Sequence, residues 1–373
     1  MVYLTSYRKI TTKDIANYAG VSQSTVSMVL NNRPDVSFSY ETKEKVLNAA
    51  KVLGYEKNKN NKTCSDTALS KLIIIMCPSL SNLYYTMLIH SITEQANKHG
   101  YSIFIAPTLR NPKLEKHYLN MYSNLKVAGI IYLYQSTLIS QIKDLVSSTP
   151  VVLISDKNED LDLDSVELNS HKTGYIVGEH LLSLGHKKVA YISTPLLAHE
   201  IPRIQRLNGL KKSFFNNNID IDNIIIKNED IKNTNQYPLD KTEYLTGYNL
   251  TKKLLTERTD ITAIIGTNDM VAIGIMDALT EMNYKIPNDF SVCGFDNTLL
   301  SSLQKISLTT VDHAIEDKGT EGVNIILKKI NSKSSTSKLQ NRPCIMRLEY
   351  EPFLVKRGST GIARTTESYK KTF

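Results

Sequence analysis

The sequence is poor in the features that build disulfide frameworks, zinc sites and membrane spans. Its four cysteines, Cys64, Cys77, Cys293 and Cys344, lie far apart and form no CxxC pair. Neither a structural zinc site nor a disulfide scaffold is expected, and a reducing cytoplasm is the default compartment. No run of about 18 consecutive apolar residues occurs, and the N-terminal residues lack the apolar core of a signal peptide. We therefore expect a cytoplasmic protein without a membrane partner.

Motifs of catalysis are missing as well. The chain contains no GxSxG, no P-loop and no HExxH, and its eight histidines are scattered without the spacing of metal ligands. No acid–base pair or activated nucleophile can be assigned from the pattern. The sequence thus predicts neither an enzyme nor a bound cofactor or metal, and a sugar-processing enzyme is a disfavoured alternative.

The chain is long, has enough hydrophobic residues to form more than one packed core, and begins with a basic segment. Its 373 residues exceed one ordinary domain, and 41% of them are hydrophobic, which allows two or three packed domains. The net charge is +8, and residues 1–62 alone hold ten Lys and Arg against five Asp and Glu. The N-terminal segment is therefore the part suited to a polyanionic partner such as nucleic acid.

Residues 11–32 have the pattern of two short helices joined by a tight turn at Gly20. Thr11 and Asp14 have the spacing of a capping box, and Ser22 suits the N-cap of the second helix. Two such helices bury little apolar surface, and they suit a helix-turn-helix that presents short polar side chains to the DNA major groove. An ordinary αα-hairpin is the alternative from spacing alone.

The following segments divide the chain. A third helix between Ser39 and Gly54 would complete a compact helical module. Residues 56–66 are polar and basic with almost no apolar side chains, which is typical of a flexible linker. Residues 228–243 form a long polar insertion that we expect at the surface near the cleft described below.

From residue 72 onward, short apolar runs alternate with helical stretches. The runs occupy residues 72–77, 101–106, 127–134, 151–155, 188–193, 222–227, 262–267 and 291–295. Continuous apolar strands, each followed by a helix, indicate parallel sheets covered on both faces, and two successive series indicate two doubly wound lobes. Because such sheets bind ligands at the carboxyl ends of their strands, the two lobes predict a cleft there.

Polar and aromatic side chains follow these strands where the cleft would lie. They are Tyr84, Tyr85, Asp156, Arg203, Arg206, Asn268, Asp269, Asp296 and Asn297. Carboxylates, amides, arginines and aromatic faces together suit a polyhydroxylated or heterocyclic small molecule. The alternatives are that the Asp and Asn residues only cap helices, that the tyrosines only pack, and that Arg206 forms a surface salt bridge.

Together these motifs resemble the LacI/GalR (lactose-repressor/galactose-repressor) family of bacterial transcription regulators. The resemblance rests on TTKDIANYAGVSQSTVSMVLNN (11–32), ETKEKVLNAAKVLGY (41–55), TNDMVAIGIMDAL (267–279), IPNDFSVCGFDN (286–297) and LVKRGST (354–360). It implies a small all-α helix-turn-helix domain followed by an α/β two-lobed core, similar to periplasmic binding proteins, with two doubly wound parallel sheets. It also implies a sequence-specific repressor that binds a pseudo-palindromic operator as a homodimer under the control of a small-molecule effector, a sugar or sugar derivative. A solute-binding protein without a regulatory role is the alternative.

The resemblance also implies domain boundaries. The helix-turn-helix domain would span 9–56, a hinge or linker 57–71, the core 72–358 and an unstructured tail 359–373. The chain would cross between the lobes near 166, 297 and 325. The first lobe would then hold 72–166 and 298–325, and the second 167–297 and 326–358.

Site residues follow by position in the family motifs. The DNA-contacting residues would be Thr12, Ser22, Gln23, Ser24, Thr25, Ser27, Met28, Asn32 and Cys64, of which Gln23, Ser24 and Met28 would face base edges. The effector-binding residues would be Tyr84, Tyr85, Asp156, Arg206, Asn268 and Asp296. Cys64 stands where the family has a leucine that enters the minor groove, and Asn61 replaces a hinge alanine. We therefore expect weaker insertion and a less sharply bent operator.

Overall fold

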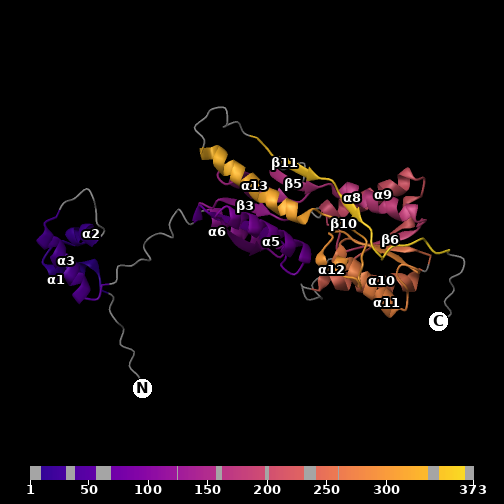
Figure 1. Cartoon of the computed structure of the whole chain (residues 1–373), viewed down its shortest axis with the longest axis horizontal. Helices are drawn as coiled ribbons and strands as arrows, with labels where there is room; N and C mark the ends of the chain where they lie inside the picture. The colour runs from indigo at the N-terminus through magenta and orange to yellow at the C-terminus, as the bar shows by residue number, and fades with distance from the viewer. Residues whose placement is uncertain are drawn as a thin grey trace, which may run out of the picture. The chain divides into compact units, whose positions relative to one another are not determined.

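A computed structural model describes residues 10–30, 38–55, 69–123, 125–156, 162–197, 201–230, 241–258, 260–334 and 344–365. The chain divides into two units, residues 1–65 and 66–373, and each is described by itself (Figure 1). Asn32, Cys64, most of the expected hinge 57–71 and most of the insertion 228–243 lie outside the described residues. No helix among the described residues is long and apolar enough to cross a membrane.

The first unit contains three helices, α1 (Thr12–Ala19), α2 (Gln23–Leu30) and α3 (Tyr40–Val52). The predicted capping box is present, since Thr11 and Asp14 bond reciprocally through side chain and backbone. Gly20 ends α1 with a φ of 67°, a left-handed conformation that glycine adopts without a steric penalty. The helices share a small buried core of Ile15, Ala16, Val26, Val46 and Ala49. The expected helical module is therefore present.

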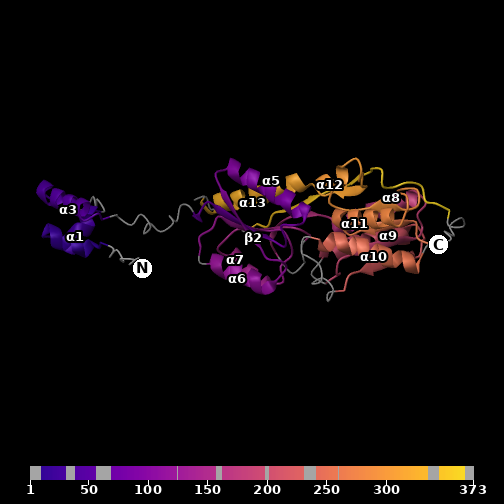
Figure 2. The same cartoon turned by 90° about the horizontal axis from the view of Figure 1, so that it is seen from below.

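The first lobe of the second unit is built on a six-stranded parallel sheet of order β11-β5-β4-β3-β1-β2. Its strands are β1 (Leu72–Cys77), β2 (Ser102–Pro107), β3 (Gly129–Tyr132), β4 (Val151–Ile154), β5 (Asp164–Leu168) and β11 (Arg347–Tyr350). One face is covered by α5 (Leu83–Lys98) and α13 (Ile315–Ser334), and the other by α6 (Pro112–Ser123) and α7 (Ile139–Val146) (Figure 2). Apolar side chains pack on both faces, as continuous apolar strands require.

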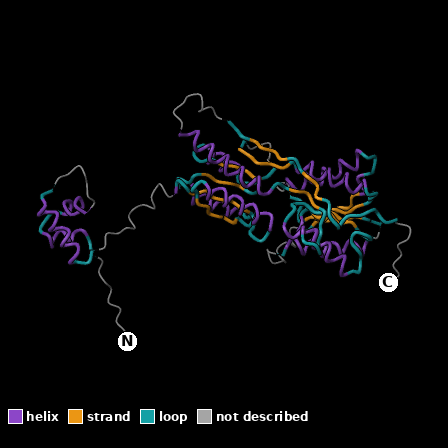
Figure 3. The backbone as a smooth tube through the Cα atoms, in the orientation of Figure 1, coloured by secondary structure: helices purple, strands orange, loops and turns teal. Residues whose placement is uncertain are grey.

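The second lobe has a four-stranded parallel sheet of order β7-β6-β8-β9. Its strands are β6 (Val189–Ser193), β7 (Ile224–Asn228), β8 (Ala263–Gly266) and β9 (Ser291–Cys293), with the short helix η2 (Ile221–Asn223) before β7. Helices α8 (Ser170–Ser183) and α9 (Ile201–Asn216) cover one face, and α10 (Thr242–Glu257) and α11 (Asp269–Glu281) cover the other (Figure 3). The predicted pair of doubly wound lobes is therefore observed.

The connections between the lobes differ from two of the three expected positions. The first lies between β5 and α8. The next follows β10 (Thr310–Asp312), because β10 and the helix α12 (Leu299–Ser302) stay with the second lobe through bridges from Cys293 to Thr309 and from Asp296 to Asp312. The last lies between β11 and β12 (Phe353–Val355), which pairs with β10. The expected crossings near 297 and 325 are therefore wrong, because α13 and β11 both belong to the first lobe.

The expected unstructured tail is also wrong for its first seven residues. Ser359 donates a hydrogen bond from its hydroxyl to the Val292 carbonyl at 2.6 Å. The side chain of Arg364 donates to the Asp289 carbonyl at 2.9 Å, and His186 lies 3.0 Å from the Gly361 carbonyl oxygen. Residues 359–365 are thereby fixed to the second lobe, and residues 366–373 lie outside the described part of the chain.

Candidate functional site

The carboxyl ends of the strands of both sheets face a cavity of about 750 Å³, a volume that includes space open to solvent. All six residues predicted to bind an effector line it: Tyr84, Tyr85, Asp156, Arg206, Asn268 and Asp296. They come from both lobes, and the first and last of them, Tyr84 and Asp296, are 212 positions apart in the sequence, so the fold brings them together. Their role in binding stays a prediction.

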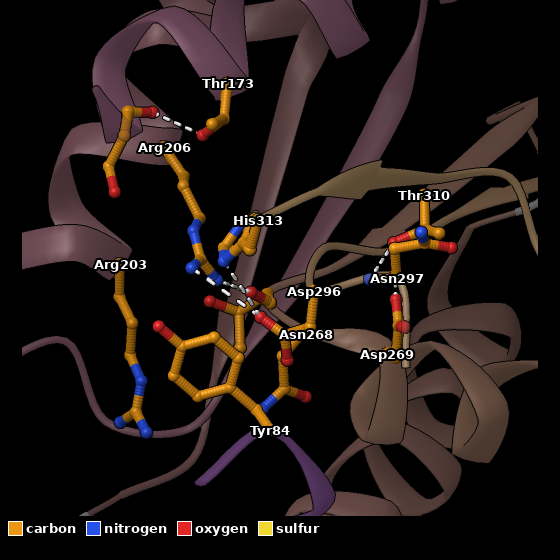
Figure 4. Close-up of polar contacts among 12 residues, drawn as sticks. Tyr84, Thr173, Arg203, Arg206, Asn268, Asp269, Asp296, Asn297, Thr310 and His313 are labelled. Atoms are coloured by element: carbon orange, nitrogen blue, oxygen red, sulfur yellow. Dashed lines mark hydrogen bonds and ion pairs between the residues drawn. The ribbon is translucent and has the colours of Figure 1, made fainter. Parts of the chain in front are cut away.

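Arg206 and Asp296 form the polar centre of the cavity (Figure 4). Arg206, on α9, is 8% exposed; its Nη1 donates to the Thr267 carbonyl at 2.6 Å, and its Nη2 lies 3.8 Å from Oδ1 of Asp296. The guanidinium lies over the ring of Phe295 at 5.0 Å from its centroid. Within the described chain the Nε of Arg206 has no hydrogen-bond partner. The side chain is thus fixed in place by the Thr267 carbonyl, Asp296 and Phe295.

His313, like Arg206, lies beside the carboxyl group of Asp296. Its Nδ1 lies 3.5 Å from Oδ1 of Asp296, and its Nε2 has no partner among the described residues. Burial, together with the nearby Arg206 and Lys318 cations, holds the pKa of His313 well below its ordinary value. Burial raises the pKa of Asp296 well above its ordinary value, although Arg206 opposes this. The cavity wall thus holds a neutral imidazole beside the buried Asp296 carboxyl group.

Tyr84 projects from the start of α5 toward the residues of the second lobe (Figure 4). Its ring meets those of Tyr85 and His313 edge-on, with centroids 5.2 and 5.8 Å away. Burial raises its pKa, and its hydroxyl accepts a hydrogen bond of 2.8 Å from Nζ of Lys318. Tyr84 therefore stays a neutral phenol that places both an aromatic edge and a hydroxyl in the cavity.

Asp156 lies two residues beyond the end of β4, as the strand-end rule predicts. Its Oδ2 accepts the backbone N–H of Ser170, the first residue of α8, at 3.2 Å. Burial raises the pKa of Asp156 to about 6, while the Ser170 contact and the Arg206 cation oppose the shift. Asp156 is therefore a carboxylate of one lobe that is held by a helix of the other.

A polar contact joins the two lobes beside the cavity. Asn82, the N-cap of α5, donates from Nδ2 to Oε2 of Glu243 at 2.7 Å. Glu243 lies in α10 of the second lobe, and its Oε1 is 3.7 Å from Nη2 of Arg203. All three residues line the cavity. Glu243 is the last residue of the insertion 228–243, and this described end lies at the cleft.

Two of the wider set of candidates do not line the cavity. Asp269 is fully buried and accepts the Thr298 N–H at 2.8 Å and the Thr310 hydroxyl at 2.6 Å. Asn297 donates to Asp312 at 2.6 Å and accepts from Arg357 at 2.6 Å. Both hold the segment between β9 and β10 in place. Asn268 serves both purposes, since it lines the cavity and also caps α11 through the Val271 N–H.

Sequence reasoning missed several residues of the cavity wall. These include Asn82, Gln135, Glu243, His313 and Lys318. His313 directly follows β10, so the strand-end rule would have found it if the short segment 310–312 had been recognised as a strand. Lys318 lies inside a helix, where the rule gives no signal.

The first unit exposes the predicted DNA-contacting side chains that the structure describes. Gln23 donates from Nε2 to the Thr12 hydroxyl at 3.0 Å, so the starts of α1 and α2 lie side by side. The Ser22 hydroxyl accepts the Thr25 N–H at 3.1 Å, which confirms the predicted N-cap. The residues Ser22, Gln23, Ser24, Ser27 and Met28 are exposed, and Thr12 and Thr25 are half-buried. Their contact with DNA stays a prediction.

Comparison with known proteins connects both units to described families. Residues 11–58 match the bacterial regulatory proteins of the lacI family, and residues 178–360 match a periplasmic binding protein-like domain. The HTH-type transcriptional repressor PurR of Mannheimia succiniciproducens is 30% identical over 328 residues, which cover 87% of this chain and 93% of that protein. Catabolite control protein A of Priestia megaterium is 28% identical over 90% of this chain and 96% of its own length.

A solved structure is similar over nearly the whole chain. The lac repressor dimer bound to operator and the anti-inducer ONPF is 25% identical and superposes with a TM-score of 0.65, covering 95% of this chain and 100% of that one. The likeness therefore extends over both the helical unit and the two-lobed core.

Proposed function

The chain belongs to the LacI family of bacterial transcription regulators, and we infer from this membership that it is a sequence-specific DNA-binding repressor controlled by a small molecule in the cleft. The observation that carries the inference is the convergence of six side chains, chosen by position in the family motifs, on one cavity between the lobes. The helix-turn-helix match disfavours a solute-binding protein without a regulatory role. The named relatives are transcriptional regulators, not enzymes.

On this proposal, two copies of the chain place their helix-turn-helix units in successive major-groove half-sites of a pseudo-palindromic operator. Gln23 and Ser24 offer hydrogen bonds to base edges, whereas the Met28 thioether offers only an apolar contact, for which a thymine methyl is the suited partner. Thr12, Ser22, Thr25 and Ser27 contact phosphates.

In the cleft, Arg206, Asn268 and Asp296 receive the hydroxyl groups of a polyhydroxylated effector, between Tyr84 and Tyr85 as aromatic walls. An effector that contacts both lobes favours one relative position of the lobes over others. Effector and operator are then coupled by about 1–3 kcal/mol, and the coupling is reciprocal.

The test is operator binding by the full-length chain. A symmetric duplex is selected from a randomised palindromic pool, and its affinity is measured by fluorescence anisotropy between 50 and 200 mM salt. We expect the affinity to fall by about 10³-fold or more, because phosphate contacts release counterions. Gln23→Ala should reduce discrimination between selected and scrambled duplexes, whereas Asn17→Ala, at an exposed position of α1 outside the predicted contacts, should not.

The second experiment first identifies an effector by a thermal-shift screen of metabolites. Arg206→Ala should then remove the effect of this compound on duplex binding. The affinity of the variant for the duplex without effector should stay nearly unchanged. Failure to recover any bound duplex at 50 mM salt would overturn the proposal. Loss of duplex binding in Arg206→Ala would overturn the assignment of the cleft.

A further inference from the structure

A buried ammonium group faces the cleft from the first lobe. Lys318 lies in the first turn of α13, is 3% exposed and lines the cavity. Its Nζ donates to the hydroxyl of Tyr84 at 2.8 Å. Within the described residues, no carboxylate oxygen lies within 4.0 Å of this nitrogen. The direct partner of the charge is thus a neutral phenol, although Asp156 and Asp296 act on it from farther away.

Two of the acids around the cavity already face a guanidinium group. Asp296 lies 3.8 Å from Arg206, and Glu243 lies 3.7 Å from Arg203. Among the described lining residues, the cations are Arg110, Arg203, Arg206 and Lys318, and the acids are Asp156, Glu243 and Asp296. Even with all three acids ionised, the described wall therefore carries one positive charge more than it carries negative charges.

An ammonium group removed from water is costly unless a counter-charge and hydrogen bonds compensate it. Burial lowers the pKa of Lys318 to about 8, so the side chain is still mainly protonated at neutral pH. Two further nitrogens at the cavity wall, Nε of Arg206 and Nε2 of His313, are buried and have no partner among the described residues. The wall thus holds a buried cation without a direct carboxylate partner among the described residues.

We propose that the effector carries an anionic group, a phosphate or a carboxylate, and that Lys318 selects for it. The Tyr84 hydroxyl holds the ammonium in place, and the anionic group occupies the adjacent cavity within reach of Lys318 and Arg206. The hydroxyl-bearing remainder meets Asn268 and Asp296. The inference rests on the proposed function of the cleft as the effector site, and it excludes a neutral sugar as the cognate ligand.

The first experiment uses inorganic phosphate as the probe. Melting temperatures of the full-length protein are measured at pH 7 in potassium phosphate and in potassium chloride of equal ionic strength. We expect phosphate to raise the melting temperature of the wild type by about 2 °C more than chloride does, because a ligand that binds the folded state stabilises it. Phosphate also stabilises folded proteins by exclusion from their surface, so binding at the site is measured as the excess of the wild-type increase over that of Lys318→Met. This excess should be retained in Lys318→Arg.

The matched control is Lys328→Met, which removes an exposed lysine of the same helix and should behave as the wild type. Lys318→Gln serves as a second neutral variant if Lys318→Met does not fold. An increase that is as large in the neutral variants as in the wild type, or one that chloride produces equally, overturns the proposal.

The second experiment tests whether the anionic group of the ligand is a phosphate or a carboxylate. Ribose 5-phosphate and gluconate are compared with ribose and glucose in the same assay, and we expect stabilisation by an anionic compound only, lost in Lys318→Met. Equal stabilisation by the neutral sugars overturns the proposal. Duplex binding by the same samples is measured separately, so that a failure confined to the anion response leaves the repressor function standing.

Discussion

At the scale of single residues, the cleft depends on a few buried ionisable groups whose pKa values the fold displaces. Asp156 is the clearest case, since burial raises its pKa to about 6 from a value of 3.8 in the unfolded chain. Between these values the folded state binds more protons than the unfolded state. The contribution of Asp156 to stability is therefore fully present below pH 3.8 and is lost as the pH rises through 6.

This shift gives a prediction for Asp156→Asn. The free energy of unfolding of the wild type, measured relative to the variant by urea denaturation, should fall by on the order of 2 kcal/mol between pH 4 and pH 7. Asp222→Asn, at an exposed carboxylate, is the control and should show no such change. A pH-independent difference between the wild type and Asp156→Asn would contradict the assigned cause.

Single residues also show what the sequence could predict. Asp156, Asn268 and Asp296 follow the ends of buried apolar strands, and this position alone indicates the cleft. Lys318 was not predictable in this way because it lies in a helix, and His313 was missed because the strand that it follows has only three residues. Their burial depends on the packing of α13 against the first sheet, which no local pattern encodes.

At the scale of elements, two glycines allow helices α8 and α9 to pack closely against each other, and this packing positions Arg206. A Cβ atom on Gly174 would lie 1.8 Å from the Arg206 carbonyl oxygen, and one on Gly209 would lie 1.8 Å from the His171 carbonyl oxygen. The two helix backbones are therefore in direct contact at two points. The Arg206 side chain starts from this contact, so its position in the cavity depends on it.

We predict that Gly174→Ala lowers the free energy of unfolding by about 2–3 kcal/mol, because the helices must separate to admit the methyl group. Urea denaturation of the full chain measures this change. His171→Ala, at an exposed position of the same helix, is the control and should stay within about 0.5 kcal/mol of the wild type. An unaltered transition in Gly174→Ala would show that the helices can separate at no cost.

The elements that sequence reasoning missed have a common physical cause. Strands β5 (DSVEL) and β11 (RLEY) are short and mixed in polarity, and β11 is exposed at the edge of its sheet. They lack the continuous apolar run by which the eight other strands of the two parallel sheets were recognised. Because β11 pairs with β5, which lies about 180 residues earlier, its place is fixed by long-range pairing. The misplaced crossing near 325 follows from the unrecognised β11, and the one near 297 follows from the equally short strand β10.

At the scale of the whole core, the contact from Asn82 to Glu243 joins the lobes by a side-chain hydrogen bond beside the cavity. We predict that Asn82→Asp opens the cleft in the absence of effector. The aspartate still accepts the Tyr84 N–H that caps α5, but it sets a second carboxylate against Glu243, and the like charges repel. The lobes should then separate by more than about 2 Å.

The separation is measured by electron–electron double resonance between spin labels at the exposed positions 97 and 212, with Cys64 and Cys344 replaced by serine. The double variant Asn82→Asp with Glu243→Gln restores a donor opposite the aspartate and should return the distance to that of the wild type. A distance that Asn82→Asp leaves unchanged would show that this contact does not hold the lobes together.

The late return of the chain to both lobes has a consequence for its synthesis. The first sheet gains its edge strand only with residues 347–350, and the second lobe gains β12 and the fixed segment 359–365 later still. The helical unit, in contrast, draws its whole core from residues before 56. As the chain leaves the ribosome, domains fold in order of emergence. The helical unit can therefore be folded while the two-lobed core is still incomplete and unable to bind a metabolite.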